Sequence, residues 1–110
     1  MQQQTIRSAA QHAQQCQAIC IDTIQYCLQM GGAHADPAHI KILQDCADIC
    51  ESAAKFMLRA SSQHRQVTSA CVDICELCAQ SCDNFPNDAQ MKACADACRA
   101  CAAACRAALA

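Results

Sequence analysis

The chain has 110 residues, of which 54% are hydrophobic and only 3% aromatic, and its formal net charge is −2. A chain of this length buries one core, so we expect a single domain over residues 1–110. The balanced charge offers no basic surface for nucleic acid, and no apolar run approaches the roughly 18 residues of a transmembrane helix, so neither nucleic acid nor a membrane is an expected partner. The first residues lack the basic and apolar regions of a secretory signal, and we therefore expect a cytoplasmic protein.

The sequence predicts long helices and no strands. It contains only two Gly and two Pro, and it has no alternating β-branched run and no hairpin dipeptide. Apolar residues instead recur three and four positions apart, which is typical of helices that pack in a bundle. We expect helices at about residues 3–30, 37–60, 63–83 and 88–108.

The predicted helix ends follow known capping chemistry. Gly31 suits the left-handed residue that follows a helix. Asp36 followed by Pro37 is typical of a helix start, and Asn87 with Gln90 resembles a capping box before the last helix. Four helices joined by short loops predict an all-α fold, an antiparallel up-down-up-down four-helix bundle.

The chain contains 13 cysteines, and they follow the inward seams of these helices. Two strings have the same spacing of four, three and four residues: Cys71, Cys75, Cys78 and Cys82, then Cys94, Cys98, Cys101 and Cys105. The first two helices add Cys16, Cys20, Cys27, Cys46 and Cys50. This is the spacing of core positions in a bundle, so thiols replace the usual leucines and line the core.

A disulfide framework does not explain this pattern. Cβ atoms at positions i and i+4 of a helix lie about 5–6 Å apart, whereas a disulfide requires about 3.8 Å. The number of cysteines is also odd. Single buried cysteines often serve as small hydrophobic residues, but packing does not require 13 oxidisable side chains. The pattern therefore favours metal binding.

Among metals, Cu(I) fits the pattern best. Soft thiolates select it, and it accepts about two sulfurs, so bridging thiolates would hold about one ion per cysteine with their charges cancelled. Thirteen thiolates would hold only about three tetrahedral Zn²⁺ and would leave uncompensated negative charge. A zinc or mixed-metal protein of metallothionein-like role remains the alternative, followed by a redox protein that uses Cys-x-x-Cys pairs.

Two further classes are less compatible with the sequence. The loop run typical of iron–sulfur clusters is missing, although Cys-x-x-Cys occurs at Cys75–Cys78 and Cys98–Cys101. A di-iron bundle enzyme requires Glu-x-x-His pairs, and the sequence has none. No nucleophile with an adjacent base is recognisable, so we do not expect an enzyme.

Weaker, neutral donors gather at one end of the predicted bundle. Met30, His34 and Met91 are expected near Cys27, where thioether and imidazole groups would act as exchangeable copper ligands at the mouth of the core. The alternative is that the methionines fill core gaps and the histidines are solvated caps. His39 lies on the inward seam of the second helix and belongs to the same cluster, but it is less favoured as a copper ligand than the other three. The opposite end is expected to be closed by Phe56, Met57, Leu58 and Val67.

These motifs resemble the copper storage proteins (Csp), a bacterial family of copper-binding four-helix bundles. The resemblance covers the whole chain and is carried by Cys16-x₃-Cys20, Cys20-x₆-Cys27 with Met30, Cys46-x₃-Cys50, and the two repeated strings joined by Cys82-Asp83-Asn84-Phe85-Pro86. It implies a homotetramer in which each bundle binds many Cu(I) ions through cysteine thiolates, for copper homeostasis and detoxification. Family members occur in exported and cytosolic forms, and since the first residues lack a secretory signal, we expect the cytosolic kind, with a copper chaperone as a further candidate partner.

The chain departs from a fully thiol-lined core at three seam positions. Thr23 stands where another thiol could be, and Ala53 and Met57 continue the second seam without thiolate donors. Since cytosolic members can carry more cysteines, the resemblance implies a lower capacity here.

Overall fold

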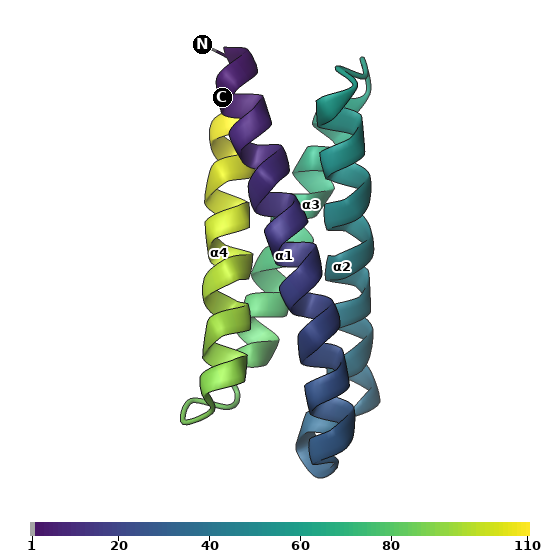
Figure 1. Ribbon diagram of the computed structural model, residues 1–110, viewed down its shortest axis with the longest axis vertical. Helices are drawn as coiled ribbons and strands as arrows, with labels where there is room; N and C mark the ends of the chain where they lie inside the picture. Colours follow the sequence, from purple (N-terminus) through teal and green to yellow (C-terminus); the bar gives the residue numbers. More distant parts are fainter. Residues whose placement is uncertain (1) are drawn as a thin grey trace.

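The computed structural model describes residues 2–110 and consists of four long helices and one short 3₁₀ helix (Figure 1). The elements are α1 (Gln2–Met30), η1 (Gly32–Ala35), α2 (Pro37–Leu58), α3 (His64–Cys82) and α4 (Ala89–Leu109). Residues 2–110 contain no strand. The expected all-α class is therefore confirmed.

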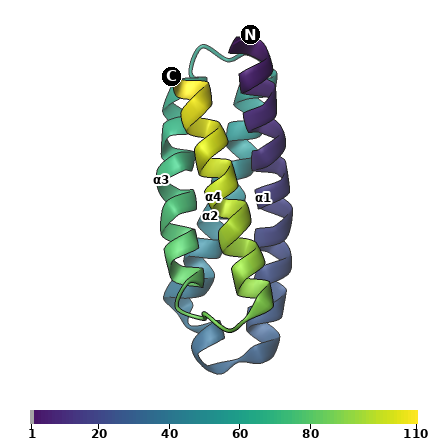
Figure 2. The same ribbon diagram turned by 90° about the vertical axis from the view of Figure 1, so that its left-hand side faces the viewer.

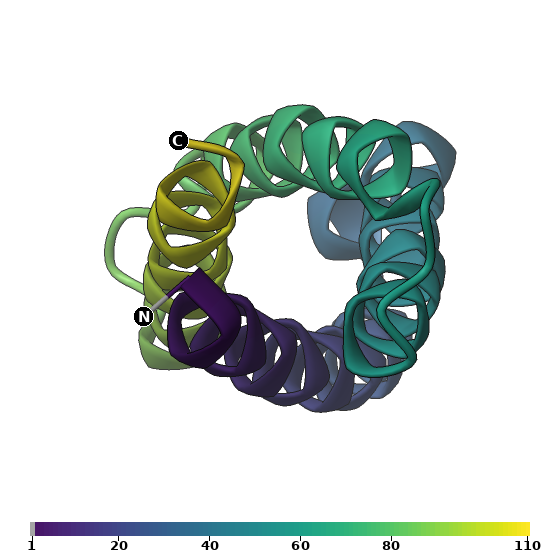
Figure 3. The ribbon, with the colours of Figure 1, turned by 90° about the horizontal axis from the view of Figure 1, so that it is seen from above.

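The four helices surround a common centre. α1 packs against α2 and α4, and α3 packs against the same two helices, so each helix has its chain neighbours beside it (Figure 3). The described termini lie at the same end of the bundle (Figure 2). This is the antiparallel up-down-up-down arrangement that the sequence predicts. The 29 residues of α1, at 1.5 Å per residue, account for the 44 Å length of the molecule.

The connection between α1 and α2 is built as the sequence predicts. Gly31 has φ of 70°, a left-handed conformation that favours glycine, and its N–H donates to the Cys27 carbonyl at 3.1 Å. Asp36 caps α2 by accepting a hydrogen bond from the Ala38 N–H at 3.1 Å, and Pro37 is the first helical residue.

The connection between α2 and α3 begins earlier than expected. α2 ends at Leu58 rather than at residue 60, because Ala60 adopts a left-handed φ of 54° and the Ser61 N–H turns back to the Phe56 carbonyl. α3 then begins at His64, one residue after the expected start.

The expected cap of the last helix is wrong by one residue. Asp88, not Asn87, caps α4, and its side chain accepts a hydrogen bond from the Met91 N–H at 3.1 Å. Gln90 does not complete a capping box, because its amide donates to the Thr23 hydroxyl of α1 at 3.0 Å. The helix start is therefore tied to the neighbouring helix as well as capped locally.

The interior has two parts. The larger part, toward the α1–α2 connection, is lined by cysteines, all 13 of which are buried. The smaller part, toward the termini, is filled by alanines such as Ala9, Ala53 and Ala108 together with Met57. Large aliphatic side chains contribute little, although Leu43 is fully buried.

Among residues 2–110, no helix is both long enough and apolar enough to cross a membrane.

Candidate metal centre

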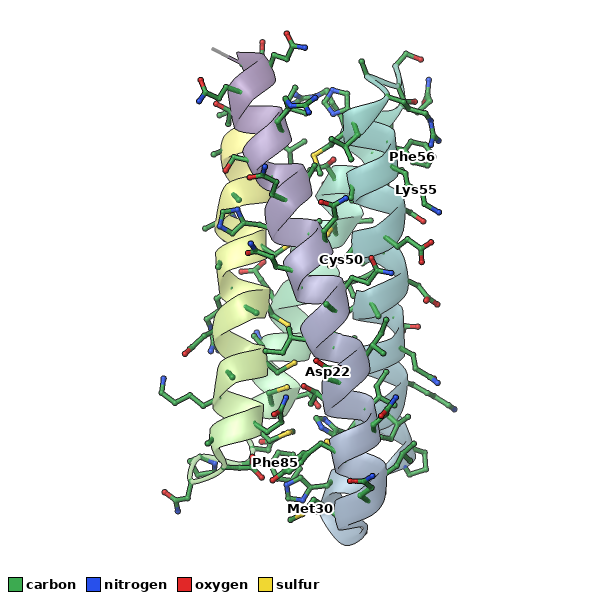
Figure 4. The ribbon with its side chains drawn as sticks, in the orientation of Figure 1. Asp22, Met30, Cys50, Lys55, Phe56 and Phe85 are labelled. Atoms are coloured by element: carbon green, nitrogen blue, oxygen red, sulfur yellow. The ribbon has the colours of Figure 1, made fainter. Side chains whose placement is uncertain are left out.

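The cysteine spacing places the thiols of all four helices on the inner side of the bundle. Residues three and four positions apart lie on one face of a helix, and each helix turns that face toward the centre. Twelve of the 13 cysteines have no exposed surface, and Cys82 is 1% exposed. In Figure 4 the sulfur atoms lie inside the bundle at successive levels, and Cys50 points inward from α2.

The sulfur atoms form a continuous network across the helices. Cys16 Sγ of α1 lies 3.7 Å from Cys98 Sγ of α4 and 3.8 Å from Cys46 Sγ of α2. Cys46 Sγ lies 3.7 Å from Cys75 Sγ of α3, which lies 3.7 Å from Cys50 Sγ. A disulfide bond would bring two sulfurs to about 2.05 Å, so these are free thiols in contact. We call this network the sulfur column.

Four groups of four thiols are close enough to bind an ion, since their sulfurs lie within 4.8 Å of one another. The groups are Cys16–Cys46–Cys50–Cys75, Cys16–Cys20–Cys46–Cys98, Cys20–Cys78–Cys94–Cys98 and Cys50–Cys71–Cys75–Cys101. The groups share members: Cys16, Cys46 and Cys50 each belong to two of them. Four separate ions with four thiolates each therefore cannot fill them, whereas ions joined by bridging thiolates can.

The sulfur separations are compatible with metal ions between them. An ion about 2.3 Å from each of two sulfurs places those sulfurs about 3.8 Å apart at a tetrahedral angle and about 4.6 Å apart in a line. The neighbouring sulfurs Cys71 and Cys75 are 3.8 Å apart, and Cys101 and Cys105 are 4.0 Å apart. Both pairs are at i and i+4 of one helix, so one ion can bind to consecutive turns with a shift below 1 Å.

Burial opposes ionisation of the thiols, whereas contacts between neighbouring thiols raise the pKa of some and lower that of others, such as Cys16 and Cys94. The pKa of Cys27 is raised to about 11, first by burial and then by the negative charges of Asp88 and Cys94. Contact with Cys16 and other thiols, together with burial, raises the pKa of Cys98. Because metals bind the thiolate, an ion that enters the column must displace protons.

The column ends at a group of mixed donors near the α1–α2 connection. Cys27 Sγ lies 3.6 Å from Met91 Sδ and 3.5 Å from His39 Nε2. The other ring nitrogen of His39 lies 2.6 Å from the Ser81 hydroxyl, and His39 is only 5% exposed. Thiol, thioether and imidazole therefore meet at one point.

His39 is the residue that the sequence analysis undervalued. From the sequence it is less favoured as a copper ligand than Met30, His34 and Met91, and the structure places its imidazole in the core beside Cys27. The signal was present in the sequence, because position 39 lies on the same helical stripe as Leu43 and Cys46.

The structure brings only one of the three expected neutral donors to the sulfur column. Met91 contacts Cys27, as stated above. Met30 is 55% exposed and lies at the extreme end of the bundle (Figure 4). His34 Nε2 lies 2.9 Å from Asp88 Oδ2, which leaves only its other nitrogen for a metal.

A clamp of polar and aromatic side chains covers this end of the column. Asp88 accepts hydrogen bonds from the Tyr26 hydroxyl at 2.6 Å and from the Met91 N–H, and it pairs with His34. These bonds, that of Tyr26 first, lower the pKa of Asp88 to about 2. The Phe85 ring lies 4.2 Å from the His34 ring, between centroids, and extends inward from the α3–α4 connection (Figure 4). We call Asp88 with Tyr26 and His34 the Asp88 clamp, and it joins α1, η1 and the start of α4.

At the opposite end, the expected apolar closure is only partly present. Met57 is 3% exposed and faces the core, whereas Leu58 is 43% exposed. Phe56 packs against the Arg59 guanidinium, which lies 4.3 Å from its ring centroid. Met57 and the neighbouring alanines, rather than Leu58, close this end.

Comparison with solved structures gives three matching chains, among them two similar bundles. One is a protein of Nitrosospira multiformis, with 31% identity and a TM-score of 0.89, where the match covers 96% of this chain and 95% of that chain. The other is the Cu(I)-bound copper storage protein BsCsp3, with 30% identity and a TM-score of 0.89, covering 96% of this chain and 99% of that chain. A comparison with curated proteins found no match.

Comparison with protein families gives one assignment. The family described as copper storage protein, Csp, matches residues 2–110, which is the whole described chain. Four thiol-lined helices around a sulfur column agree with that match. The chain therefore belongs to the copper storage protein family.

Proposed function

We propose that this protein stores Cu(I) in its sulfur column, with about one ion per cysteine. The observation that carries the proposal is the sharing of thiols between neighbouring groups, because shared thiolates must bridge ions. When each Cu(I) binds two thiolates and each thiolate bridges two ions, the charges cancel inside a buried core. All 13 cysteines would take part as ligands.

The alternative, zinc storage of metallothionein-like type, is weaker. Tetrahedral Zn²⁺ with four thiolates carries two excess negative charges per site, and the centre of this bundle offers no cation to balance them. The buried polar side chains of residues 2–110 are Thr23, His39 and Thr68, and the latter two lie toward opposite ends of the bundle. The binding of Cu(I) by BsCsp3, at 30% identity over nearly the full length of both chains, supports copper.

The end with Cys27, His39 and Met91 is proposed to receive and release the ions. Neutral thioether and imidazole ligands exchange copper more readily than bridging thiolates do. The expected roles of Met30 and His34 stay predictions, because both lie at the rim of this end rather than on the sulfur column.

The cellular role follows from the same chemistry. Thirteen free thiols persist only in a reducing compartment, which supports a cytoplasmic location. We infer a store that sequesters copper for homeostasis and detoxification rather than an enzyme, filled by a copper chaperone or another carrier. We further propose a homotetramer, for which the exposed Ile21 and Leu28 on α1 provide apolar contact surface.

An anaerobic titration tests the function. Reduced protein should take up roughly 13 Cu(I) against a competing Cu(I) chelator, with luminescence or absorbance of Cu(I)–thiolate bonds rising to that point. Saturation at three or four ions, or tighter binding of Zn²⁺ in a matched titration, would contradict the proposal. Redox cycling of the thiols without metal uptake would favour a redox protein instead.

A further inference from the structure

A cleft opens on the side of the bundle next to the receiving end of the sulfur column. It has a volume of about 560 Å³ and lies between α2 and α3, below the α3–α4 connection. Ala38, His39, Leu77, Ser81, Asn84 and Phe85 are among its lining residues. Sites that bind small molecules have volumes of about 300–1,000 Å³, so the cleft has the size of a small-molecule site.

His39 forms the wall between this cleft and the sulfur column. Its side chain lines the cleft, yet its Nε2 lies 3.5 Å from Cys27 Sγ inside the core. Its Nδ1 lies 2.6 Å from Ser81 Oγ, which also lines the cleft. When Nδ1–H donates to that hydroxyl, Nε2 carries its lone pair toward Cys27, which is the state that a metal-binding imidazole requires.

The route along the bundle axis, in contrast, is covered by side chains. The Asp88 clamp joins Tyr26 and His34 across the end, and Phe85 stacks on His34 at 4.2 Å between ring centroids. The cleft therefore offers a path between solvent and the Cys27 thiol in which the His39 imidazole lies between the two.

We propose that copper passes through this side cleft, delivered and removed as a Cu(I) complex of a small thiol compound that occupies the cleft. This proposal rests on the proposed storage function and adds the route and the carrier. A soft donor is needed to hold Cu(I) in a reducing solution, and a thiol is the soft donor available there. A protein carrier would bury about 800 Å² of surface on each partner, far more than a cleft of this size presents.

The transfer is a ligand substitution without a change of oxidation state. The bond between the carrier sulfur and Cu(I) breaks, and bonds from Cu(I) to His39 Nε2 and Cys27 Sγ form. The proton of the Cys27 thiol passes to the departing thiolate, so charge is conserved. Removal is the same sequence in reverse.

Three tryptophan variants test the route. Ala38→Trp fills the cleft from an exposed position in the first turn of α2. Ser52→Trp adds the same ring on the same helix beside Ile49 and Ile74, about 20 Å away. Met30→Trp adds the ring at the axial end. The probe is the Cu(I) complex of glutathione, and the readouts are the rate of Cu(I)–thiolate absorbance, the rate of removal by a chromogenic Cu(I) chelator, and the final number of ions.

We expect Ala38→Trp to slow both rates at least tenfold while the final number of ions and the oligomeric state stay those of the wild type. Ser52→Trp should transfer copper at the wild-type rates, and Met30→Trp should slow transfer less than Ala38→Trp does. Slowing by Met30→Trp but not by Ala38→Trp would overturn the proposal in favour of the axial route. A changed oligomeric state in Ala38→Trp would also overturn it, because the cleft would then be covered by a second copy.

A smaller probe tests the carrier. Cu(I) supplied as its acetonitrile complex should be slowed less by Ala38→Trp than Cu(I) supplied with glutathione. Equal slowing would show that the ion passes without its thiol and would overturn that part of the proposal. Failure of the storage function itself is distinguishable, since the wild type would then take up far fewer ions with either probe.

Discussion

The Tyr26 hydroxyl donates a 2.6 Å hydrogen bond to Asp88 Oδ2, although 62 residues separate the two in the chain. The bond ties the last turns of α1 to the first turn of α4. Asp88 also caps α4 and pairs with His34 of η1, so one carboxylate holds three elements together.

Replacing Asp88 with Ala should therefore destabilise the metal-free protein at pH 7. Losing the N-cap alone costs about 1 kcal/mol, and the lost bonds to Tyr26 and His34 add to that cost. Chemical unfolding under anaerobic, reducing conditions measures the change in the free energy of unfolding. Asp22→Ala removes an exposed carboxylate of α1 and serves as the control, with no comparable loss expected.

The same comparison at low pH gives a second check. Because the pKa of Asp88 is lowered to about 2, its contribution is complete above its ordinary pKa of about 4 and is lost as the pH falls toward 2. The stability difference between the wild type and Asp88→Ala should shrink over that range. A difference that persists unchanged at pH 2 would mean that the charge of Asp88 does not contribute.

Cysteines at the centre of the sulfur column should matter more than those at its end. Cys46 Sγ lies within 3.9 Å of the sulfurs of Cys16, Cys75 and Cys98, whereas Cys105 Sγ has its closest thiol contact with Cys101 at 4.0 Å. Anaerobic titration should show Cys46→Ala losing more Cu(I) ions than Cys105→Ala, because Cys46 has three neighbouring thiols with which to share ions and Cys105 has one. Equal losses would argue against bridging.

Met91→Leu should change the rate of copper transfer rather than the capacity. Leucine has a similar volume, so the metal-free stability should change by less than about 1.5 kcal/mol. The thioether next to Cys27 is lost, and we expect slower transfer in stopped-flow loading with an unchanged final number of ions. The double variant Met30→Ala/His34→Ala should have a smaller effect, because Met30 is 55% exposed and His34 is engaged by Asp88.

Leu43→Ala should lower the stability of the metal-free protein, and copper binding should restore part of it. Leu43 is fully buried, and truncating such a residue costs about 2–5 kcal/mol in the metal-free protein. Ions that bind only the folded state raise its stability, so loading with Cu(I) should restore much of the lost melting temperature. Calorimetry of both forms measures this, and Leu58→Ala at an exposed position is the control. A Leu43→Ala protein that gains nothing from copper would contradict the storage proposal.

The helices and the thiol lining were predictable from the sequence because both depend on local periodicity. A spacing of three and four residues determines which face of a helix turns inward. In the Cys71–Cys82 and Cys94–Cys105 strings this spacing places all four thiols of each string on one helical face. Even the left-handed turn at Gly31 follows from its neighbours along the chain.

The features that the sequence left open depend on contacts between distant segments. Asn87 and Asp88 are both suitable caps, and the bond from Tyr26 favours Asp88. His39 is polar and was the least favoured of the donors at this end, yet Ser81 of the neighbouring helix lies 2.6 Å from its second nitrogen and so permits its burial. Neither partner lies near in the sequence.

The alanine-lined end of the interior has a consequence for how the protein can be used. Ala9, Ala53, Ala108 and Met57 pack the helices together without any thiol among them. Because no thiol lies among these residues, we expect that region to keep the same contacts whether the sulfurs bind protons or copper, and so to hold the four helices together in both states. We therefore expect the bundle to be folded before copper binds, so that repeated loading and release of copper does not require the chain to refold.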